Sequence, residues 1–451
     1  MNLLIISLAI LFIILSFLSL KKAIILTLVF LPSYLIRFEL LGIPSTVLEL
    51  MVLIIFATWV IKNREKIKNP KAWKAPAFWR EALLVIIAAS FGVLVNFGSA
   101  SLGVWKAYFL EPILFFFVIA HTFKGKAGAK TLISALSVSA FFTALFAVYQ
   151  KISGDFISNP FWAADETRRV VSWFSYPNAV GLFLAPITML AIGRFFAFNT
   201  KEDLRNSTKK IFYLVVIFFS LAAIFFAKSE GALIALAGSG WLFLFFAGKK
   251  PRYFAITLAV IGLISIFSFA PIKNYTTEKA TLMDLSGQIR RQQWTETWKM
   301  LNDGKLFTGA GLSGYQEAVK PFHQAGIFVK NSDPNWLRKV LWNKEYRESV
   351  WQPVEIYFYP HNIILNFWSE IGFFGLLVFA WLIAKQLFLS FRASIRNKSR
   401  DRFLILGAGT AMTAIIIHGL VDVPYFKNDL ALIFWIIIAL TAILIKPSEK
   451  E

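Results

Sequence analysis

Apolar runs of about 20 residues recur along almost the whole chain, and this is the length that a helix needs to cross a hydrocarbon core of about 30 Å. Apolar residues make up 57% of the 451 residues, and 47 of the residues are phenylalanine. No soluble domain has enough interior to bury so many apolar runs of this length. The sequence therefore predicts an all-α integral membrane protein with many transmembrane helices.

The apolar runs form two membrane regions that flank one long polar segment. We predict a first region at residues 1–270, a polar segment at 271–360 and a second region at 361–451. No small-residue cleavage site follows the first run, so we expect a retained helix and not a signal peptide. We expect twelve or thirteen spans, and the orientation of the N-terminus depends on whether one of the first two only dips into the membrane. The predicted spans are residues 2–20, 23–36, 46–61, 82–96, 107–123, 131–149, 175–196, 212–227, 231–247, 253–269, 363–389, 404–421 and 429–445.

Positive charge lies in short clusters between these spans. The formal net charge is +21. Because Lys and Arg favour the cytoplasmic side of a membrane, such clusters report topology and do not indicate a nucleic-acid-binding patch. Alternation of the spans then places the clusters in the cytoplasm and the segment 271–360 outside it. The clusters lie at residues 62–80, 124–130, 201–210, 249–252 and 392–402.

The polar segment 271–360 combines tryptophans with basic residues. Trp rings stack on the apolar faces of sugar rings, and Arg binds phosphate oxygens through two N–H groups. The segment therefore favours a phosphorylated glycan as ligand. Alternatively, its tryptophans form a small core within the segment or lie at the membrane interface. We expect a partly helical segment with helices at 288–301 and 335–347. The tryptophans are Trp294, Trp298, Trp336, Trp342 and Trp351.

Sequence patterns for metal and nucleotide chemistry are missing. Cys is absent, no Asp-x-Asp or Asp-x-Glu pair occurs, and His residues are not clustered with metal-ligand spacing. No phosphate-binding Gly-x-x-x-x-Gly-Lys-Ser/Thr loop occurs either. We therefore expect no cofactor, no metal site and no nucleotide hydrolysis.

Several short motifs follow one another in an order that resembles the signature of the O-antigen ligase and polymerase superfamily. Together they span residues 168–422, and their order and placement are more specific than any single motif. The motifs are Arg169, Ser175–Ala179, Lys228–Ala232, Ser286–Arg290 with Trp294, Leu306–Leu312 with Tyr315, Pro360–Asn362, Glu370 with Gly372 and Gly375, and His418–Asp422.

The resemblance implies a multi-pass glycosyltransferase of the bacterial inner membrane whose site faces the extracytoplasmic side. Its donor would be a glycan linked to undecaprenyl diphosphate. Its acceptor would be a lipid or glycan at the outer face of the membrane, and the lipid A core of lipopolysaccharide, another repeat unit, a protein side chain and a cell-wall glycan all remain open. Direct displacement of the lipid diphosphate would invert the anomeric centre and need no metal. Two alternatives remain open: a polymerase that uses a second lipid-linked glycan as acceptor, and a transporter of polysaccharide lipids.

The same resemblance implies roles for three residues around the polar segment. His361 precedes a span directly, and its imidazole would take the proton from the acceptor hydroxyl, since His is the motif's base near neutral pH. Arg290, four residues before Trp294, would hold the diphosphate and stabilise its growing charge. Arg291 is the alternative to Arg290.

A second family arginine has no direct counterpart here. In the family this arginine lies in a Ser-Arg-Gly-Ala-like turn after the eighth span. Here the turn reads Lys228-Ser229-Glu230-Gly231-Ala232, so Lys228, just before the serine, is the candidate substitute. Lys cannot form the two-pronged contact that Arg forms. Either Lys228 or Arg169, or neither of them, supplies the second positive charge.

The remaining candidate residues are expected to bind substrate or shape the mouth of the site. Asp422 closes the twelfth span and would orient the imidazole or contact the acceptor, and His418 lies one turn before it. The other expected substrate contacts are Asn178, Trp294, Tyr315 and Asn362.

Overall fold

The computed structural model describes residues 3–40, 42–69, 75–198 and 204–445. Helices dominate these residues, and strands are limited to two short hairpins. The predicted all-α integral membrane fold is confirmed. Parts of two predicted basic clusters, at Lys71, Lys74 and Lys201, and the tail after Ile445 lie outside the described residues.

Each predicted span corresponds to a helix or to a continuous run of helices. Among the described residues, 9 of these are long and apolar enough to cross a membrane. They are α6 (Ser99–Val104) continued by η3 (Trp105–Leu110) and α7 (Glu111–Thr122), α8 (Gly125–Ser153), α10 (Pro177–Phe196), α11 (Leu204–Phe226), α12 (Glu230–Ala247), α13 (Lys249–Ser268), α19 (Ile363–Arg396), α20 (Arg402–Gly419) and α21 (Asn428–Ile445).

The first four predicted spans are helices of at most 17 residues. The second is interrupted, because Pro32 follows α2 and begins a short 3-10 helix, η1 (Leu31–Leu35). Length and composition alone therefore support nine spans among the described residues, and twelve or thirteen stays a prediction. The four helices are α1 (Leu3–Leu18), α2 (Leu20–Val29), α3 (Val47–Lys62) and α5 (Trp79–Val95). Between η1 and α3 lies an antiparallel hairpin of β1 (Arg37–Leu40) and β2 (Ile43–Thr46).

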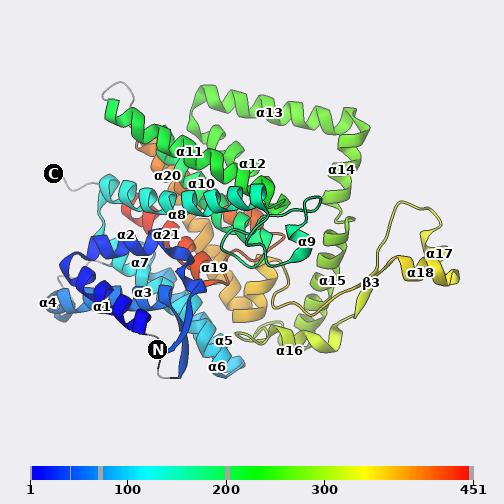
Figure 1. Cartoon of the computed structure of the whole chain (residues 1–451), viewed down its shortest axis with the longest axis horizontal. Helices are drawn as coiled ribbons and strands as arrows, with labels where there is room; N and C mark the ends of the chain where they lie inside the picture. The colour runs from blue at the N-terminus through cyan, green and yellow to red at the C-terminus, as the bar shows by residue number, and fades with distance from the viewer. Residues whose placement is uncertain (1–2, 41, 70–74, 199–203, 446–451) are drawn as a thin grey trace.

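The core of the bundle consists of α10, α20 and α21, whose side chains are buried on almost every face. Close approach of α10 and α20 depends on glycine. A Cβ at Gly193 would lie 2.5 Å from the Phe403 carbonyl oxygen and 2.8 Å from the Gly407 Cα. Small residues let membrane helices pack this closely. By contrast, α13 lies at the outer edge of the bundle (Figure 1) and buries only Ala255.

The basic turns meet at one end of the bundle. Lys126 and Lys130 form ion pairs with Asp401, at 3.1 Å and 2.8 Å. Arg400 donates a hydrogen bond to the Phe198 carbonyl, and Arg402 donates one to the Ala247 carbonyl. The turns before α8 and α20 and after α10 and α12 therefore share one end, as the alternation of spans predicts.

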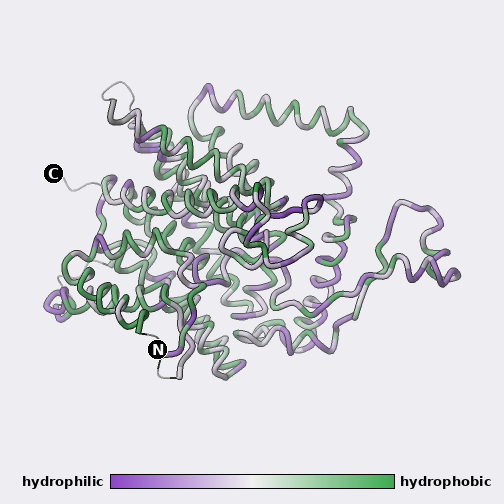
Figure 2. Tube along the Cα trace, in the orientation of Figure 1, coloured by the Kyte–Doolittle hydropathy of each residue, from purple (hydrophilic) through white to green (hydrophobic). Residues whose placement is uncertain are grey.

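The polar segment lies at the other end of the bundle. It begins with α14 (Ala270–Ala280) and α15 (Leu285–Met300). A second part, which contains α17 (Trp336–Trp342) and α18 (Lys344–Ser349), projects away from the bundle and is called the arm (Figure 1). Figure 2 shows hydrophilic residues along the arm and hydrophobic residues along the bundle helices. Both predicted helices are present, the second one divided at Asn343. The remaining elements are η4 (Leu301–Lys305), α16 (Tyr315–Val319), η5 (Lys320–Phe322), β3 (Gly326–Phe328) and β4 (Trp351–Pro353).

A glycine-containing motif fastens this segment to the bundle. Gly309 and Gly311 have φ of +67° and +80°, a conformation that glycine adopts most readily. The next residue, Leu312, donates its N–H to the carbonyl oxygen of Gly92 in α5 at 3.0 Å. Close by, the Glu370 carboxylate in α19 accepts the N–H of Ser313 at 2.8 Å. The motif thus fixes the position of the polar segment over the ends of α5 and α19.

Candidate active site

Most of the residues singled out in the sequence meet where α20 ends. Five parts of the chain contribute: the first turns of α15, the residues just before α19, the turn between α20 and α21, the start of α10, and the turn between α11 and α12. These parts are separated by up to 244 residues in sequence. Only tertiary packing brings them together.

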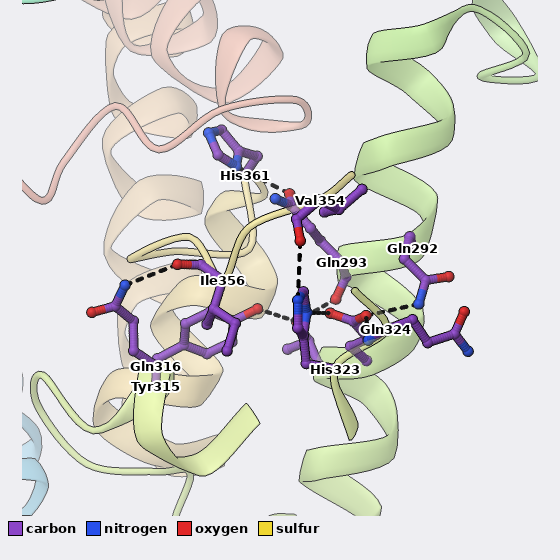
Figure 3. Close-up of polar contacts among 11 residues, drawn as sticks. Gln292, Gln293, Tyr315, Gln316, His323, Gln324, Val354, Ile356 and His361 are labelled. Atoms are coloured by element: carbon purple, nitrogen blue, oxygen red, sulfur yellow. Dashed lines mark hydrogen bonds and ion pairs between the residues drawn. The ribbon is translucent and has the colours of Figure 1, made fainter. Parts of the chain in front are cut away.

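His361 lies between β4 and α19 and is held on two sides. Its Nδ1 lies 3.1 Å from the Gln293 side-chain oxygen, and the Tyr357 ring packs edge-on against it at 5.0 Å between ring centroids. With the Gln293 amide in this orientation, its oxygen can only accept a hydrogen bond, so the contact assigns the proton to Nδ1 and the lone pair to Nε2. In Figure 3, Gln293 of α15 points toward His361. The imidazole is therefore arranged to receive a proton at Nε2.

The backbone conformation at His361 and the next residue also holds the imidazole in place. Its φ is +44°, which is uncommon for a residue with a side chain. The following residue, Asn362, caps α19 by accepting the N–H groups of Ile364 and Leu365 at 3.0 Å and 3.1 Å. Asn362 also donates a hydrogen bond to the Leu420 carbonyl at 3.1 Å, which links this turn to the end of α20.

The surroundings of His361 favour its neutral form. Burial lowers the pKa of the imidazole, the positive charge of Arg290 lowers it further, and the negative charge of Asp422 acts in the opposite direction. An imidazole that is neutral near pH 7 can act as a general base.

One face of α15 supplies the contacts to the bundle. Residues 290, 293, 294 and 297 follow the helical repeat and lie on the same side. Arg290 donates from Nε to the Val421 carbonyl at 2.8 Å and from one terminal nitrogen to the Ser286 hydroxyl at 2.7 Å. Trp294 donates from its indole nitrogen to the Pro360 carbonyl at 2.9 Å. Among the described residues, nothing binds the second terminal nitrogen of Arg290, so it is available to an anion.

Arg291 and Tyr315 lie outside this cluster. The Arg291 guanidinium is directed toward the Met283 sulfur, 3.8 Å away, on another side of α15. The Tyr315 hydroxyl contacts the Thr297 hydroxyl at 2.8 Å, and its ring belongs to the small apolar core of the polar segment. The structure thus brings Arg290 to His361 and gives Tyr315 a packing role.

A second chain of polar contacts runs through Arg169, Asn178 and Asp422. The Arg169 guanidinium donates to the Asn178 side-chain oxygen at 3.3 Å, and the Asn178 amide donates to the Asp422 carboxylate at 3.2 Å. The other carboxylate oxygen of Asp422 accepts the N–H of Val423 at 2.8 Å. A guanidinium, an amide and a carboxylate are thereby joined by hydrogen bonds, and the carboxylate acts on the charge of His361.

Arg169 is also bound to the turn that contains Lys228. It donates to the Ala227 carbonyl at 3.0 Å and to the Lys228 carbonyl at 3.3 Å. The backbone of Lys228 has a φ of +51°, and its side chain is exposed. Burial lowers the pKa of Arg169, although Glu230 acts against this change. Of the two candidates for the second positive charge, Arg169 is the one fixed within the cluster.

His418 is buried beneath the cluster, one turn before Asp422. A Cβ at Gly231 would lie 2.8 Å from the His418 ring, so the two residues pack face to face between α12 and α20. This contact gives a physical reason for a glycine in the Ser-Glu-Gly-Ala turn. His418 therefore lies against the start of α12, next to the turn that contains Lys228.

Several residues of the site were missed in the sequence. Gln293 lies three residues after Arg290, and helical spacing alone would have placed it on the same face. Tyr357 and His323 have no comparable signal, because they lie in irregular chain. His323 contacts Glu296 of α15 at 3.3 Å and the Val354 carbonyl at 3.1 Å, and so holds the segment between β4 and His361 against α15 (Figure 3).

Another missed contact fixes α14 to the bundle. Lys279 forms ion pairs with Glu230 at 2.6 Å and with Asp284 at 3.0 Å. These two carboxylates raise the pKa of Lys279 against the opposing effect of its burial. As for metals, the described part of the chain has no group of three or more His, Asp or Glu side chains that would suit a metal ion.

Comparison with known proteins finds a family similarity in part of the chain. Residues 215–380 match the family model described as O-antigen ligase. The matched range contains Lys228, Arg290, Trp294 and His361, whereas the chain of contacts through Arg169 and Asp422 extends beyond it. No curated protein matches the chain significantly. The family resemblance of the motifs is confirmed.

Proposed function

Since residues 215–380 carry the O-antigen ligase family match, we propose that the protein transfers a glycan from an undecaprenyl-diphosphate carrier to an acceptor in the bacterial envelope. The family supports a glycosyltransferase-like membrane enzyme in general terms. The single observation that carries the specific proposal is the position of His361. Its Nδ1 is bound to Gln293, and its Nε2 is left to act beside Arg290 and Asp422.

In the proposed reaction, the acceptor hydroxyl gives its proton to Nε2 of His361. The oxygen then forms a bond to the anomeric carbon while the bond from that carbon to the diphosphate oxygen breaks. The electron pair leaves with the diphosphate, whose added charge the free end of Arg290 stabilises. Arg169 supplies a second positive charge nearby. Direct displacement inverts the anomeric centre.

In this proposal the lipid part of the donor lies along α13. This helix is apolar, buries only Ala255, and continues into α14. Lys279 of α14 is paired with Glu230, two residues after Lys228. A polyprenyl chain in contact with α13 would therefore bring its diphosphate toward the cluster from the side of the bilayer.

The orientation follows from the positive-inside rule. The end of the bundle where Lys126, Lys130 and Arg402 meet would face the cytoplasm. The candidate site is at the opposite end of these helices, which supports an extracytoplasmic site in the inner membrane.

The proposal is tested with purified protein in lipid nanodiscs, a labelled undecaprenyl-diphosphate glycan, envelope acceptors and EDTA. We expect label on an acceptor with the wild type, also in EDTA, and no transfer with His361→Ala. His121→Ala, at the far end of α7, is the matched control and should retain transfer. Absence of transfer with every acceptor, or equal activity of His361→Ala, would overturn the proposal.

The same assay separates the two alternatives. Lengthening of the glycan when only lipid-linked glycans are present identifies a polymerase. Movement of the lipid across the bilayer without a new glycosidic bond, unaffected by His361→Ala, identifies a transporter.

A further inference from the structure

A cavity of about 620 Å³ opens beside the β1–β2 hairpin, outside the cluster around His361. Its size falls within the usual range for a small-molecule site, about 300–1,000 Å³. The walls come from η1, the hairpin, the start of α3, the run from α6 through η3, and the turn before α21. The polar lining includes Tyr34, Arg37, Glu39, Glu49, Lys106, Tyr108, Lys427 and Asn428.

Part of this lining is already neutralised. Lys106 forms ion pairs with Glu49 at 2.7 Å and with Glu111 at 3.2 Å. The other oxygen of Glu49 accepts a hydrogen bond from Asn428 at 2.7 Å. Glu39 lies exposed on the hairpin. The ionic interactions of Lys106 and Glu49 are therefore satisfied within the protein.

Three other groups of the lining have no such partner among the described residues. Arg37 and Lys427 form no ion pair there, and the buried Tyr34 hydroxyl has no hydrogen-bond partner. The Lys427 ammonium lies instead over aromatic rings, 4.4 Å from the Phe174 centroid and 5.1 Å from that of Tyr34. The negative charges of Asp429 and Asp422 partly offset that of Lys427, and neither forms an ion pair with it. Arg37, Lys427 and the Tyr34 hydroxyl thus remain for a ligand that carries negative charge.

The cavity adjoins the candidate active site through Lys427 and Tyr176. Lys427 lies 5.4 Å from the Tyr176 ring centroid, and Tyr176 directly precedes the start of α10, where Asn178 binds Asp422. A chain of side-chain contacts thus runs from Lys427 at the cavity through Tyr176 to the helix start that binds Asp422.

We propose that this cavity is a glycan subsite that binds an acidic sugar, with the negative group of the sugar paired to Arg37 and Lys427. The Tyr34 hydroxyl, which lines the cavity, donates a hydrogen bond to the ligand. The negative group is a carboxylate or a phosphate, since both accept hydrogen bonds from these side chains. The inference rests on the proposed function, because it assigns the cavity to one of the glycan substrates.

The test is a binding measurement that requires no turnover. Saturation-transfer NMR is recorded on the full-length protein in nanodiscs with glucuronate, glucose 1-phosphate or glucose. We expect binding of glucuronate, glucose 1-phosphate or both, and none of neutral glucose. Binding of one anion alone identifies the carboxylate or the phosphate as the recognised group. Equal binding of glucose and the anions, or no binding of either anion, overturns the inference.

Variants locate the binding to the cavity. Arg37→Gln and Lys427→Gln should each weaken the affinity for the anion about tenfold, which corresponds to loss of one charge-assisted contact. Arg37 is exposed on the hairpin, so its variant should fold even if Lys427→Gln does not. Lys344→Gln, on the distant arm, is the matched control and should bind normally. Unchanged binding in both cavity variants also overturns the inference.

Failure of this inference is distinguishable from failure of the proposed function. His361→Ala should bind the anion normally while transferring nothing. If the wild type transfers glycan but binds no anion in the cavity, the subsite is refuted and the proposed transferase function stands. If the protein binds the anion but transfers no glycan, the cavity stands as an acidic-sugar site and the proposed transferase function is refuted.

Discussion

The hydrogen bond between Gln293 and His361 offers the sharpest test of the proposed base. In Gln293→Leu, a side chain of similar size replaces the amide and removes the acceptor 3.1 Å from Nδ1. A neutral hydrogen bond contributes about 1 kcal/mol net, and loss of the imidazole orientation adds to this effect. We expect kcat/KM to fall about tenfold, less than the 10²–10⁴-fold (roughly) that a general base provides. The assay measures glycan transfer in nanodiscs from a single lipid-linked glycan donor.

A double-mutant cycle shows whether the effect passes through the imidazole. Because His361→Ala transfers nothing, the cycle is measured by thermal unfolding. In that background Gln293→Leu should cause no further loss of stability, because the contact it removes no longer exists. Gln292→Leu, on the neighbouring face of α15, loses only its bond to Glu296 and should retain most activity. An equal loss in both backgrounds would refute the assignment of Gln293 as a positioning residue.

The pH profile gives a readout that a purely structural role would not change. The proposed base acts when neutral, so activity is lost as the pH falls through the pKa of His361. Burial and Arg290 lower this pKa, so the acid limb should lie below the ordinary value of about 6.5. Gln293→Glu keeps the acceptor and adds a negative charge, which raises the pKa and moves the acid limb to higher pH. An unshifted limb would contradict the contact seen here.

Further predictions concern the diphosphate contacts, the link through Asn178 and one packing glycine. Arg290→Gln should reduce transfer about 10²–10³-fold and raise the pKa of His361, whereas the exposed Arg291→Gln should have little effect in the same assay. Asn178→Ala breaks the link between Arg169 and Asp422, and we expect about a tenfold loss of transfer with unchanged thermal unfolding. Gly231→Ala places a methyl group against the His418 ring and should lower stability by about 1–3 kcal/mol in thermal unfolding, with Gly240→Ala, which has open space, as control.

The arrangement of the membrane helices could be predicted because it follows from one-dimensional features. Apolar runs located a helix for every predicted span, and basic clusters predicted which turns meet Asp401 at one end of the bundle. The shortness of α1, α2, α3 and α5 was harder to see. Pro32 interrupts an apolar run without changing its hydropathy, so the run looks long enough to cross the membrane although the helix in it ends at Val29.

The candidate site could be predicted only where its residues are close in sequence. His361 and Asn362 were expected at the start of a span, and the structure makes Asn362 the cap of α19. By contrast, whether Lys228 or Arg169 lies within the cluster depends on the turn after α11, which no local pattern describes. Tyr315 shows the opposite case: it stands in a motif but packs against Thr297 in the core of the polar segment.

The way the site is anchored explains why its donors were easier to find than its acceptors. Arg290 binds the Val421 carbonyl, Trp294 the Pro360 carbonyl, and Asn362 the Leu420 carbonyl. Each acceptor is a backbone group, and a backbone carbonyl is present whatever side chain the residue carries. A sequence therefore marks the Arg, Trp and Asn that donate but carries no mark of their partners. The same feature makes the site tolerant: substitution of the exposed Leu420 side chain should leave the bond to Asn362 in place, whereas loss of Asn362 releases both α19 and the end of α20 from the turn that holds His361.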